Sequence, residues 1–483
     1  MTRLFFATYG VHSRGSGLKI GFITLGCDKN TVDSERYLAQ LAGRGGELTD
    51  DLADAEVIVV NTCGFIDAAK KESIDAIVEA GRMKVDGQCR AVVAVGCMVQ
   101  RHKAELAEAL PEIDLFLGSS EVDRLIPELD VRGLLSEPVE LHPGDRIYAG
   151  DLAHVRYLKI SEGCDHGCAF CAIPLMRGRH RSFASAEVVR EAQLLELQGA
   201  REVNLVAQDL AHYGRDRRDG VALAELLEAL VAGTAIPWFR MLYLYSTGIT
   251  PRLLDVVANE PRVLPYIDMP IQHAADAVLA RMRRPERTRT IRERVRRFRD
   301  ALPDATIRTT CIVGFPGETD AEFEQLLAFL EETQFDRVGA FTYSPQEGTR
   351  AFGLADDVPD DVKRERLERL SELQRSITTE RYERHVGRIT QLLIDRPAAD
   401  GEPAEGRAPW QADDVDGITR IYTDAPAGAF VRARIDEVVD DYDFAATAAG
   451  VVLLPPALAP ATPRRQMLPM AGGAVVTVGS FGR

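Results

Sequence analysis

The sequence lacks any run of about 18 uninterrupted apolar residues, the length that a membrane-spanning helix requires. Its first 17 residues hold two arginines and a short apolar run, but no long apolar core or cleavage site of a secretory signal peptide. We interpret residues 1–17 as a disordered extension. Repeats of the solenoid type are also missing from the sequence. These absences predict a cytoplasmic protein that contacts no membrane.

Positive charge is scarce, because 58 Lys and Arg stand against 74 Asp and Glu, for a net charge of −16. Such a chain repels the phosphate backbone of free nucleic acid and suits a basic partner. Its 483 residues, 46% of them hydrophobic, are enough for about two to four domains with substantial cores. There are only eight cysteines, and in a reducing cytoplasm we expect them to be metal ligands or redox groups rather than disulfides.

Three apolar segments near the N-terminus each end on a cysteine. LKIGFITLGC, AEVIVVNTC and RAVVAVGC have the continuous hydrophobicity of buried parallel strands, and helical segments alternate with them. This alternation predicts a doubly wound α/β domain, in which ligands bind at the carboxyl edge of the sheet. The three thiols are therefore expected to meet at one edge, with chance placement as the alternative. They are Cys27, Cys63 and Cys97.

A second alternation of strands and helices begins near Asp151. Six strands with helical crossovers predict a partial (β/α)6 barrel, whose reacting groups lie on loops after the strands. The strand candidates are VRYLKIS, EVNLVAQD, WFRMLYLY, PYIDMPIQ, TIRTTCIVGF and RVGAFTYS.

The pattern changes after a helix that ends near His385. Short alternating strands predict a small β-barrel, and the Ala- and Pro-rich tail beyond it is expected to be loosely ordered. The predicted domains are an extension at 1–17, the α/β domain at 18–145, the partial barrel at 151–385, the small β-barrel at 386–446 and the tail at 447–483.

The segment SEGCDHGCAFCAIPLMRG follows the first barrel strand and spaces its cysteines as C-x3-C-x2-C. Zinc and iron–sulfur clusters generally take four protein ligands, and this set stops at three. A [4Fe–4S] cluster on three thiolates leaves one iron for S-adenosylmethionine (SAM), whose one-electron cleavage yields a 5′-deoxyadenosyl radical. Zinc with His166 or His180 as fourth ligand is the competing interpretation. The spacing favours the cluster, and we expect His166 to be a solvent-facing loop residue.

The spacing C-x3-C-x-F-C resembles that of radical-SAM enzymes. Together with TLGCDKN, VVNTCGFI and VGC upstream, it resembles the methylthiotransferases of that superfamily over roughly residues 18–446. The segments CAIPLMRGRHRS, YIDMPIQHA, IVGFPGET and FTYSPQEGT add to the resemblance. It implies an N-terminal domain with an auxiliary [4Fe–4S] cluster, a radical-SAM barrel, and a C-terminal TRAM barrel that aids substrate recognition. The implied reaction uses two SAM molecules, one as methyl donor and one cleaved reductively.

The resemblance also implies roles for individual cysteines. Cys89 and Cys311 match neither triad, and we expect both to be buried packing residues. The auxiliary cluster, open at one iron for an added sulfur, would be held by Cys27, Cys63 and Cys97, and the radical-generating cluster by Cys164, Cys168 and Cys171.

Several residues near the expected barrel mouth are candidates for binding SAM or substrate. Each has a plain structural alternative: packing for an aromatic ring, satisfying loop backbone for a strand-end amide, and shaping a turn for a glycine. For Glu318, beside them in the GFPGET turn, capping of the following helix is the plain structural alternative. The SAM candidates are Phe170, placed to stack on adenine, Gln208 and Gln272 at strand ends beside Asp209 and His273, and Gly314 in the GFPGET turn.

The resemblance leaves two substrates, an adenosine of tRNA or an aspartate of ribosomal protein S-twelve. Residues 387–445 hold six Arg and thirteen Asp or Glu, giving 6 − 13 = −7. An acidic barrel suits a basic ribosomal protein, although the charge is also explained by solubility alone. GRAPWQADDVDG and GCDKNTVDSERYL resemble the aspartate-modifying branch. We therefore predict methylthiolation of the aspartate β-carbon, on the free protein or the small ribosomal subunit, with a low-potential electron donor such as flavodoxin or ferredoxin.

One segment favours RNA instead. Residues 281–300 contain ten arginines and predict a helix after Pro285 with Ile291, Val295 and Phe298 on its apolar face. An exposed helix with solvated arginines is the simpler interpretation. The alternatives are therefore a tRNA adenosine (N6-isopentenyladenosine-type) methylthiotransferase and a non-enzymatic scaffold stabilised by zinc.

Overall fold

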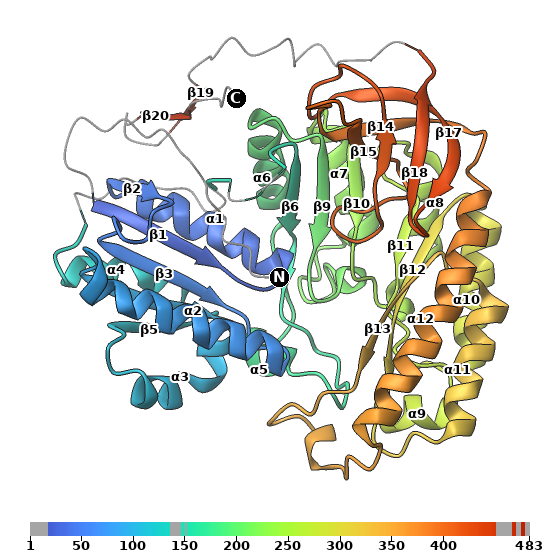
Figure 1. The fold of residues 1–483 in the computed structure, drawn as a ribbon, viewed down its shortest axis with the longest axis horizontal. Coiled ribbons are helices and arrows are strands. Elements are labelled where there is room, and N and C mark those ends of the chain that lie inside the picture. The colour runs from blue at the N-terminus through green and yellow to red at the C-terminus, as the bar shows by residue number, and fades with distance from the viewer. Residues whose placement is uncertain are drawn as a thin grey trace. The chain divides into compact units, whose positions relative to one another are not determined.

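The computed structural model describes residues 18–135, 146–148, 150 and 152–450, and the backbone of 466–469 and 475–478. Within these residues the chain forms two compact units. The first unit holds the N-terminal α/β domain and also the short segment Ala172–Arg179. The second holds Leu152–Cys171 and His180–Leu458, and the backbone strands described beyond it belong to the first unit. Figure 1 labels the elements of both units. The expectation for residues 1–17 lies outside the described residues.

The first unit is built on a parallel five-stranded sheet of order β2-β1-β3-β4-β5. The three strands predicted from apolar runs are β1, β3 and β4, while β2 and β5 were not predicted. Every residue of β3 and β4 is buried, as expected for central strands covered on both faces. The bounds are β1 (Leu18–Thr24), β2 (Gly46–Thr49), β3 (Val57–Thr62), β4 (Ala91–Gly96) and β5 (Leu115–Gly118).

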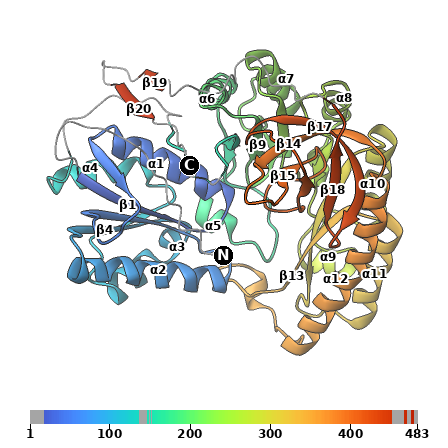
Figure 2. The same cartoon turned by 45° about the horizontal axis from the view of Figure 1, so that its top comes forward.

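Helices cover both faces of this sheet (Figure 2). Tyr37 of α1 and Leu125 of α4 pack in one apolar cluster, and Ile77 of α2 and Met98 of α3 pack in the other. The predicted doubly wound α/β fold is confirmed. Its strand order places the topological switch point, where such folds bind ligands, between β1 and β3. The helices are α1 (Asp28–Ala42), α2 (Asp67–Asp86), α3 (Cys97–Ala109), α4 (Leu125–Val131) and α5 (Ile173–Arg177).

The second unit contains six parallel strands in the order β6-β9-β10-β11-β12-β13 (Figure 1). A bridge between Phe239 and Val263 joins its two three-stranded halves. Within the described residues no pairing joins β6 to β13, so the barrel is partial, as predicted. All six strand candidates are confirmed. They are β6 (Val155–Lys159), β9 (Glu202–Val206), β10 (Trp238–Met241), β11 (Tyr266–Asp268), β12 (Thr306–Val313) and β13 (Arg337–Thr342), with β7 (Ser161–Glu162) and β8 (Arg181–Ser182) as a short antiparallel pair.

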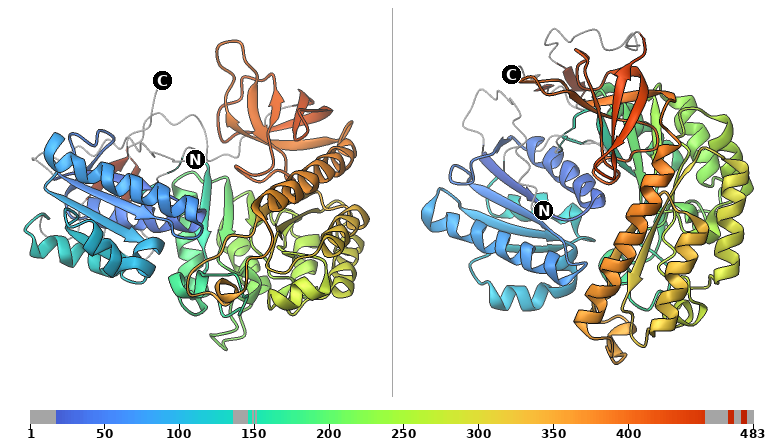
Figure 3. Two further views of the ribbon diagram at one scale, coloured as in Figure 1. Left: turned by 60° about the horizontal axis from the view of Figure 1, so that its bottom comes forward. Right: turned by 45° about the vertical axis from the view of Figure 1, so that its right-hand side comes forward.

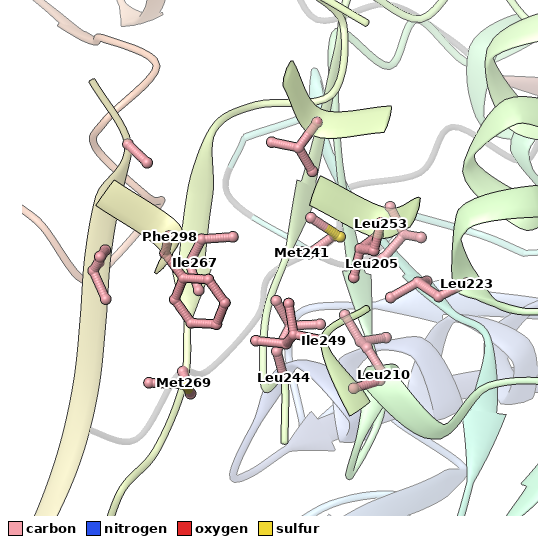
Figure 4. Packing of buried hydrophobic residues seen from close by; sticks show 14 of the residues in the cluster. Leu205, Leu210, Leu223, Met241, Leu244, Ile249, Leu253, Ile267, Met269 and Phe298 are labelled. Atoms are coloured by element: carbon pink, nitrogen blue, oxygen red, sulfur yellow. The ribbon is translucent and has the colours of Figure 1, made fainter. Parts of the chain in front are cut away.

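Alternate residues of these strands build the core against the helices. Leu205, Met241 and Ile267 from three strands pack with Leu253 of α8 and Phe298 of α10 (Figure 4). The apolar face predicted for α10 is confirmed, since Ile291, Val295 and Phe298 are all buried. Figure 3 shows α10, α11 and α12 along the outer side of the sheet. The helices are α6 (Ser185–Leu197), α7 (Leu223–Gly233), α8 (Pro251–Asn259), α9 (Asp276–Arg281), α10 (Thr288–Ala301), α11 (Asp320–Thr333) and α12 (Asp360–Glu383).

A closed five-stranded β-barrel of order β14-β15-β16-β18-β17 follows α12, and it confirms the predicted small barrel. It is tied to the larger barrel by buried charge, because Arg407 donates to Asp395 and to Glu202 of β9 at 2.6 Å each. Arg240 of β10 donates to the backbone carbonyls of Pro409 and Gln411. The strands are β14 (Ile389–Arg396), β15 (Ala404–Arg407), β16 (Thr419–Ile421), β17 (Phe430–Val439) and β18 (Asp443–Ala448).

Most of the predicted tail lies outside the described residues. Within it, β19 (Gln466–Pro469) and β20 (Val475–Val478) pair antiparallel. Among the residues that the structure describes, none of the helices is long and apolar enough to span a bilayer.

Candidate functional site

Cys27, Cys63 and Cys97 lie at the carboxyl edge of the N-terminal sheet. Each follows one of the three adjacent strands β1, β3 and β4, which stay in register to their ends, where Thr62 lies opposite Gly96. Cys27 and Cys63 follow the two strands that flank the switch point. Residues more than 30 positions apart in sequence are therefore brought to one edge.

The glycines that precede two of these cysteines are required by the geometry. Gly26 has φ +97°, and a Cβ there would lie 2.8 Å from the Cβ of Cys63. Gly96 has φ +101°, and a Cβ there would lie 2.4 Å from Oδ1 of Asn61. Both backbones occupy the region that L side chains avoid, and both approach a neighbouring strand closely. The Gly-Cys pairs of the sequence thus allow the chain after β1 and the end of β4 to approach the end of β3 closely.

The three thiols differ in exposure but influence one another electrostatically. Cys27 is exposed, Cys63 is half-buried and Cys97 is buried. Burial, with a smaller contribution from the charge of Cys27 and against the charge of Arg177, raises the pKa of the Cys97 thiol to about 12. Burial and the charge of Cys27 also raise the pKa of Cys63. Thiols with raised pKa values are weak nucleophiles at neutral pH, whereas a metal displaces their protons. Three converging sulfur donors therefore fit an iron–sulfur cluster better than nucleophilic catalysis.

Arg177 is a buried arginine that contacts this triad. Its Nε donates to Sγ of Cys97 at 3.1 Å, its Nη1 donates to Oδ2 of Asp33 at 2.6 Å, and its Nη2 donates to Oδ1 of Asn30. Asn30 and Asp33 belong to α1, and Arg177 ends α5. Because Arg177 follows Cys171 by only six positions, the segment that carries the second triad continues directly to the first.

Cys164, Cys168 and Cys171 lie in the loop between β7 and α5, after the first barrel strand, and all three are half-buried. The loop is anchored by its backbone, since the amide of Ala169 donates to the carbonyl of Met282 at 2.9 Å. Burial raises the pKa of Cys164 to about 11. As at the first triad, a thiol held protonated by burial suits a metal that replaces the proton.

Arg284 is the buried cation of the second triad. Its Nη1 lies 3.8 Å from Sγ of Cys168, and its Nη2 pairs with Glu286 at 3.1 Å. The guanidinium also lies over the ring of Tyr245, 4.2 Å from the centroid. Each triad therefore has one buried arginine directed at one of its sulfurs.

His166 is half-buried and contacts neighbouring side chains, so the expectation of a solvent-facing loop residue was wrong. Its ring stacks on Tyr245 at 3.7 Å between centroids, and its Nε2 lies 2.7 Å from Oδ2 of Asp209. Asp209 also accepts from the amides of Ala211 and Tyr245. Burial alone would raise the pKa of Asp209, but hydrogen bonds from His166 and His212 hold it well below its usual range. Sequence spacing alone does not show that the ring of Tyr245, in the loop after β10, stacks on His166.

These contacts bear on the zinc interpretation. His166, Asp209 and His212 bring possible ligand atoms within 4.8 Å of one another, but these atoms bond among themselves. Nε2 of His180, the other candidate fourth ligand, lies 3.1 Å from Oγ of Ser182. The geometry therefore favours a three-thiol set at the second triad over a zinc site completed by either histidine.

Two of the SAM candidates are side chains at the barrel mouth. Nε2 of Gln208 donates to Oε1 of Glu162 at 2.8 Å, while its own Oε1 is buried and has no hydrogen-bond partner among the described residues. Such an acceptor suits a ligand donor. Phe170 packs edge-to-face against Phe315 at 6.5 Å in an apolar cluster beneath the loop.

The other two candidates are defined by their backbone. Gln272 has φ +70°, and its amide donates to the carbonyl of Thr310 at 2.8 Å. Gly314 has φ +71°, and a Cβ there would lie 2.3 Å from Cγ of Lys363. The structure thus shows a turn-shaping reason for this glycine.

Glu318 does not cap α11, so the structural alternative offered for it is wrong. Thr319 is the N-cap, and its Oγ1 accepts from the amide of Glu322. Glu318 is instead buried, where it pairs with Arg366 at 2.9 Å and lies 3.6 Å from Nε2 of His273. Cys89 and Cys311 are buried in apolar clusters, which confirms them as packing residues.

Sequence reasoning missed Arg177 and Arg284. Arg177 stands in PLMRG directly after the second triad, and Arg284 stands within the arginine-rich segment. Only the fold shows that these two arginines are buried and that each lies at a thiol.

Known families match successive parts of the chain. Residues 19–118 match the Uncharacterized protein family UPF0004, residues 158–330 the Radical SAM superfamily, and residues 386–449 the TRAM domain. The protein is thus a radical-SAM enzyme, a class that uses an iron–sulfur cluster and SAM. In the structure of the methyltransferase TsrM from Kitasatospora setae with tryptophan and a SAM analog, the shared fold covers 67% of this chain and 73% of that one, with TM-score 0.52 and 15% identity.

Curated relatives identify the family within the radical-SAM enzymes. A protein named ribosomal protein uS12 (S-twelve) methylthiotransferase RimO, from Anaeromyxobacter sp. (strain Fw109-5), is 43% identical over 466 residues, covering 93% of this chain and 98% of that one. The protein of that name from Geobacter sulfurreducens is 42% identical over 437 residues, covering 88% and 97%. The chain belongs to the RimO family of methylthiotransferases.

Proposed function

We propose that this protein transfers a methylthio group to the β-carbon of an aspartate in ribosomal protein uS12, using two [4Fe–4S] clusters and SAM. The observation that carries the proposal is the pair of cysteine triads, each after parallel strands and each with a buried arginine at one sulfur. The names of relatives that match nearly the whole chain support the substrate. In this proposal Cys27, Cys63 and Cys97 hold the auxiliary cluster, and Cys164, Cys168 and Cys171 hold the radical-generating one.

The residues of the chain bind, orient and shield the reacting groups. When bound, the cluster and SAM supply one-electron cleavage of a carbon–sulfur bond, and with it hydrogen abstraction. Gln208 offers a buried acceptor to SAM, and Arg284 directs positive charge toward Cys168. The apolar cluster of Ala169, Phe170 and Phe315 beneath the loop excludes water from that side.

The small barrel supports a basic partner. Asp395 and Asp416 are buried in pairs with Arg407 and Arg337, so they do not add to its surface charge. Its exposed groups are nevertheless acidic, because seven acids stand against four arginines, for 4 − 7 = −3. Such a surface attracts a basic ribosomal protein. The exposed acids are Asp400, Glu402, Asp414, Asp424, Glu437, Asp440 and Asp441, and the arginines are Arg388, Arg396, Arg432 and Arg434.

Ion pairs reduce the basic character of the arginine-rich segment. Arg292 pairs with Glu332 of α11, and Arg281 pairs with Glu322. Arg289 pairs with an acid on its own helix. Fewer free cations therefore remain for an RNA backbone than ten arginines suggest. A low-potential donor such as flavodoxin or ferredoxin, and a cytoplasmic location beside the ribosome, complete the proposal.

The test uses anaerobically reconstituted full-length protein. We expect about eight irons per chain and release of 5′-deoxyadenosine with dithionite and SAM. In cells, deletion of the gene should lower the mass of uS12 by about 46 Da, one methylthio group in place of one hydrogen. Unchanged uS12 with altered tRNA adenosine would establish the tRNA alternative. Stoichiometric zinc without iron would establish the scaffold.

A further inference from the structure

We propose that Arg177 is a positioning residue that stabilises added negative charge on the auxiliary cluster and so raises its reduction potential. The inference rests on the proposed function, because it requires a cluster on Cys27, Cys63 and Cys97. It goes beyond that function by giving the cluster its own charge-compensating residue.

The guanidinium of Arg177 is fixed in three directions. Nε points to Sγ of Cys97, Nη1 to the carboxylate of Asp33, and Nη2 to Oδ1 of Asn30. The side chain of Arg177 is only 3% exposed, and that of Asp33 is 9% exposed. A planar guanidinium bonded on three sides cannot turn away from the sulfur without breaking other bonds. The fold therefore holds the Nε–H group of Arg177 against Sγ of Cys97.

A fixed donor at a ligand sulfur favours the more negative state of a cluster. Hydrogen bonds to cysteine sulfurs and nearby positive charge both raise the reduction potential of iron–sulfur clusters. The effect is larger in a buried site, where water screens charge poorly. Asp33 works in the opposite direction, because its carboxylate offsets part of the charge of Arg177. The two residues should therefore shift the potential with opposite signs.

An added sulfur at the open iron is the second source of negative charge. A thiolate bound there makes the cluster more anionic, as an added electron does. The Nε–H group of Arg177 should therefore favour both the reduced cluster and the cluster with a bound thiolate. Arg177 is thereby expected to strengthen the binding of methanethiolate as well as to raise the potential.

The experiment isolates one cluster in the full-length chain. The triple variant Cys164→Ala, Cys168→Ala, Cys171→Ala leaves the first triad alone, with about four irons per chain expected. Its midpoint potential is measured by titration with dithionite, followed by electron paramagnetic resonance. Methanethiol is then added, and the spectral change gives its apparent affinity.

In that background, Arg177→Gln should lower the midpoint potential and weaken the binding of methanethiol. Arg177→Lys, which keeps the charge but not the fork of donors, should give intermediate values. Asp33→Asn should raise the potential, a shift that simple structural damage does not produce. If Arg177→Gln holds no iron, the inference is tested by the other two variants. The midpoint potential should then be higher than that of the background in Asp33→Asn and lower in Arg177→Lys.

An unchanged potential in Arg177→Gln, or an unchanged or lower one in Asp33→Asn, overturns the inference and leaves the proposed function intact. Absence of a cluster in the triple variant itself, with Arg177 and Asp33 in place, overturns the auxiliary cluster and with it the proposed function. The two failures are therefore distinguishable.

Discussion

Nε of Arg177 lies 3.1 Å from Sγ of Cys97, although the two residues are 80 positions apart. Arg177 ends α5, the short helix that begins two residues after Cys171. One short segment thus carries a cysteine of the second triad and a hydrogen-bond donor to a cysteine of the first. Because the fold fixes the position of this donor, Arg177 does not need to move when the negative charge at the first triad changes.

The two triads are predicted to act as separable metal sites. Cys63→Ala removes a ligand from the first triad only, so iron should fall from about eight to about four per chain while 5′-deoxyadenosine is still formed and methylthio transfer is lost. Cys168→Ala should also halve the iron but abolish 5′-deoxyadenosine. Iron analysis and chromatography of the SAM products measure both. Loss of 5′-deoxyadenosine in Cys63→Ala would contradict separate sites.

Gly26 is predicted to be irreplaceable next to the first triad. Gly26→Ala places a Cβ 2.8 Å from the Cβ of Cys63 at φ +97°, so it should lose about 1–2 kcal/mol of stability from backbone strain alone and release iron from that triad. The matched control is Gly133→Ala, where φ is +65° and nothing lies within 4 Å of the new Cβ. Because of the same backbone strain, Gly133→Ala should also lower the free energy of unfolding measured in urea, but it should keep its iron. Equal iron loss in both variants would show that the contact with Cys63 is unimportant.

Much of the fold could be predicted because long apolar runs mark buried parallel strands. The strands missed in the N-terminal sheet, β2 and β5, have only four residues each, and β2 is the polar sequence GELT at the sheet edge. A strand of four residues is too short to show a recognisable hydrophobic periodicity.

The site could be predicted only in part because spacing reveals ligands but not their surroundings. Cysteines at strand ends are visible in sequence, since parallel strands end at one edge. The half-buried position of His166 depends on stacking with Tyr245, which lies in the loop after β10. Glu318 stands next to the true N-cap of α11, Thr319, so its position in sequence also suited a cap. Its partner Arg366 lies on α12, far along the chain, and the pair is visible only in the fold.

Acid should destabilise the second unit through His385. Burial, followed by the nearby charges of Arg384, Arg388 and Arg381, lowers the pKa of His385 from 6.5 to about 3. Since the folded pKa lies below the unfolded one, the unfolded state binds more protons as the pH falls below 6.5. The free energy of unfolding should therefore drop by about 2 kcal/mol between pH 6.5 and pH 5.

Tryptophan fluorescence during urea unfolding of the iron-free protein measures this loss, because Trp410 stacks on His385 at 3.9 Å. His385→Gln is expected to be less stable at pH 7 but to lose less on acidification. The Asp395 carboxyl, with a pKa of about 2, titrates only in stronger acid. An equal loss in wild type and His385→Gln would assign the acid sensitivity to other groups.

Asp209 is predicted to position the loop of the second triad through His166. Asp209→Asn weakens the charge-assisted bonds to His166 and His212, so the rate of 5′-deoxyadenosine formation should fall about 10- to 100-fold, the usual cost of losing a residue that orients a ligand. Iron at the first triad should be retained. The control is Asp216→Asn, which loses bonds to Ser182 beyond the cysteine loop. An Asp209→Asn defect no larger than that of the control would show that Asp209 does not position the loop through His166.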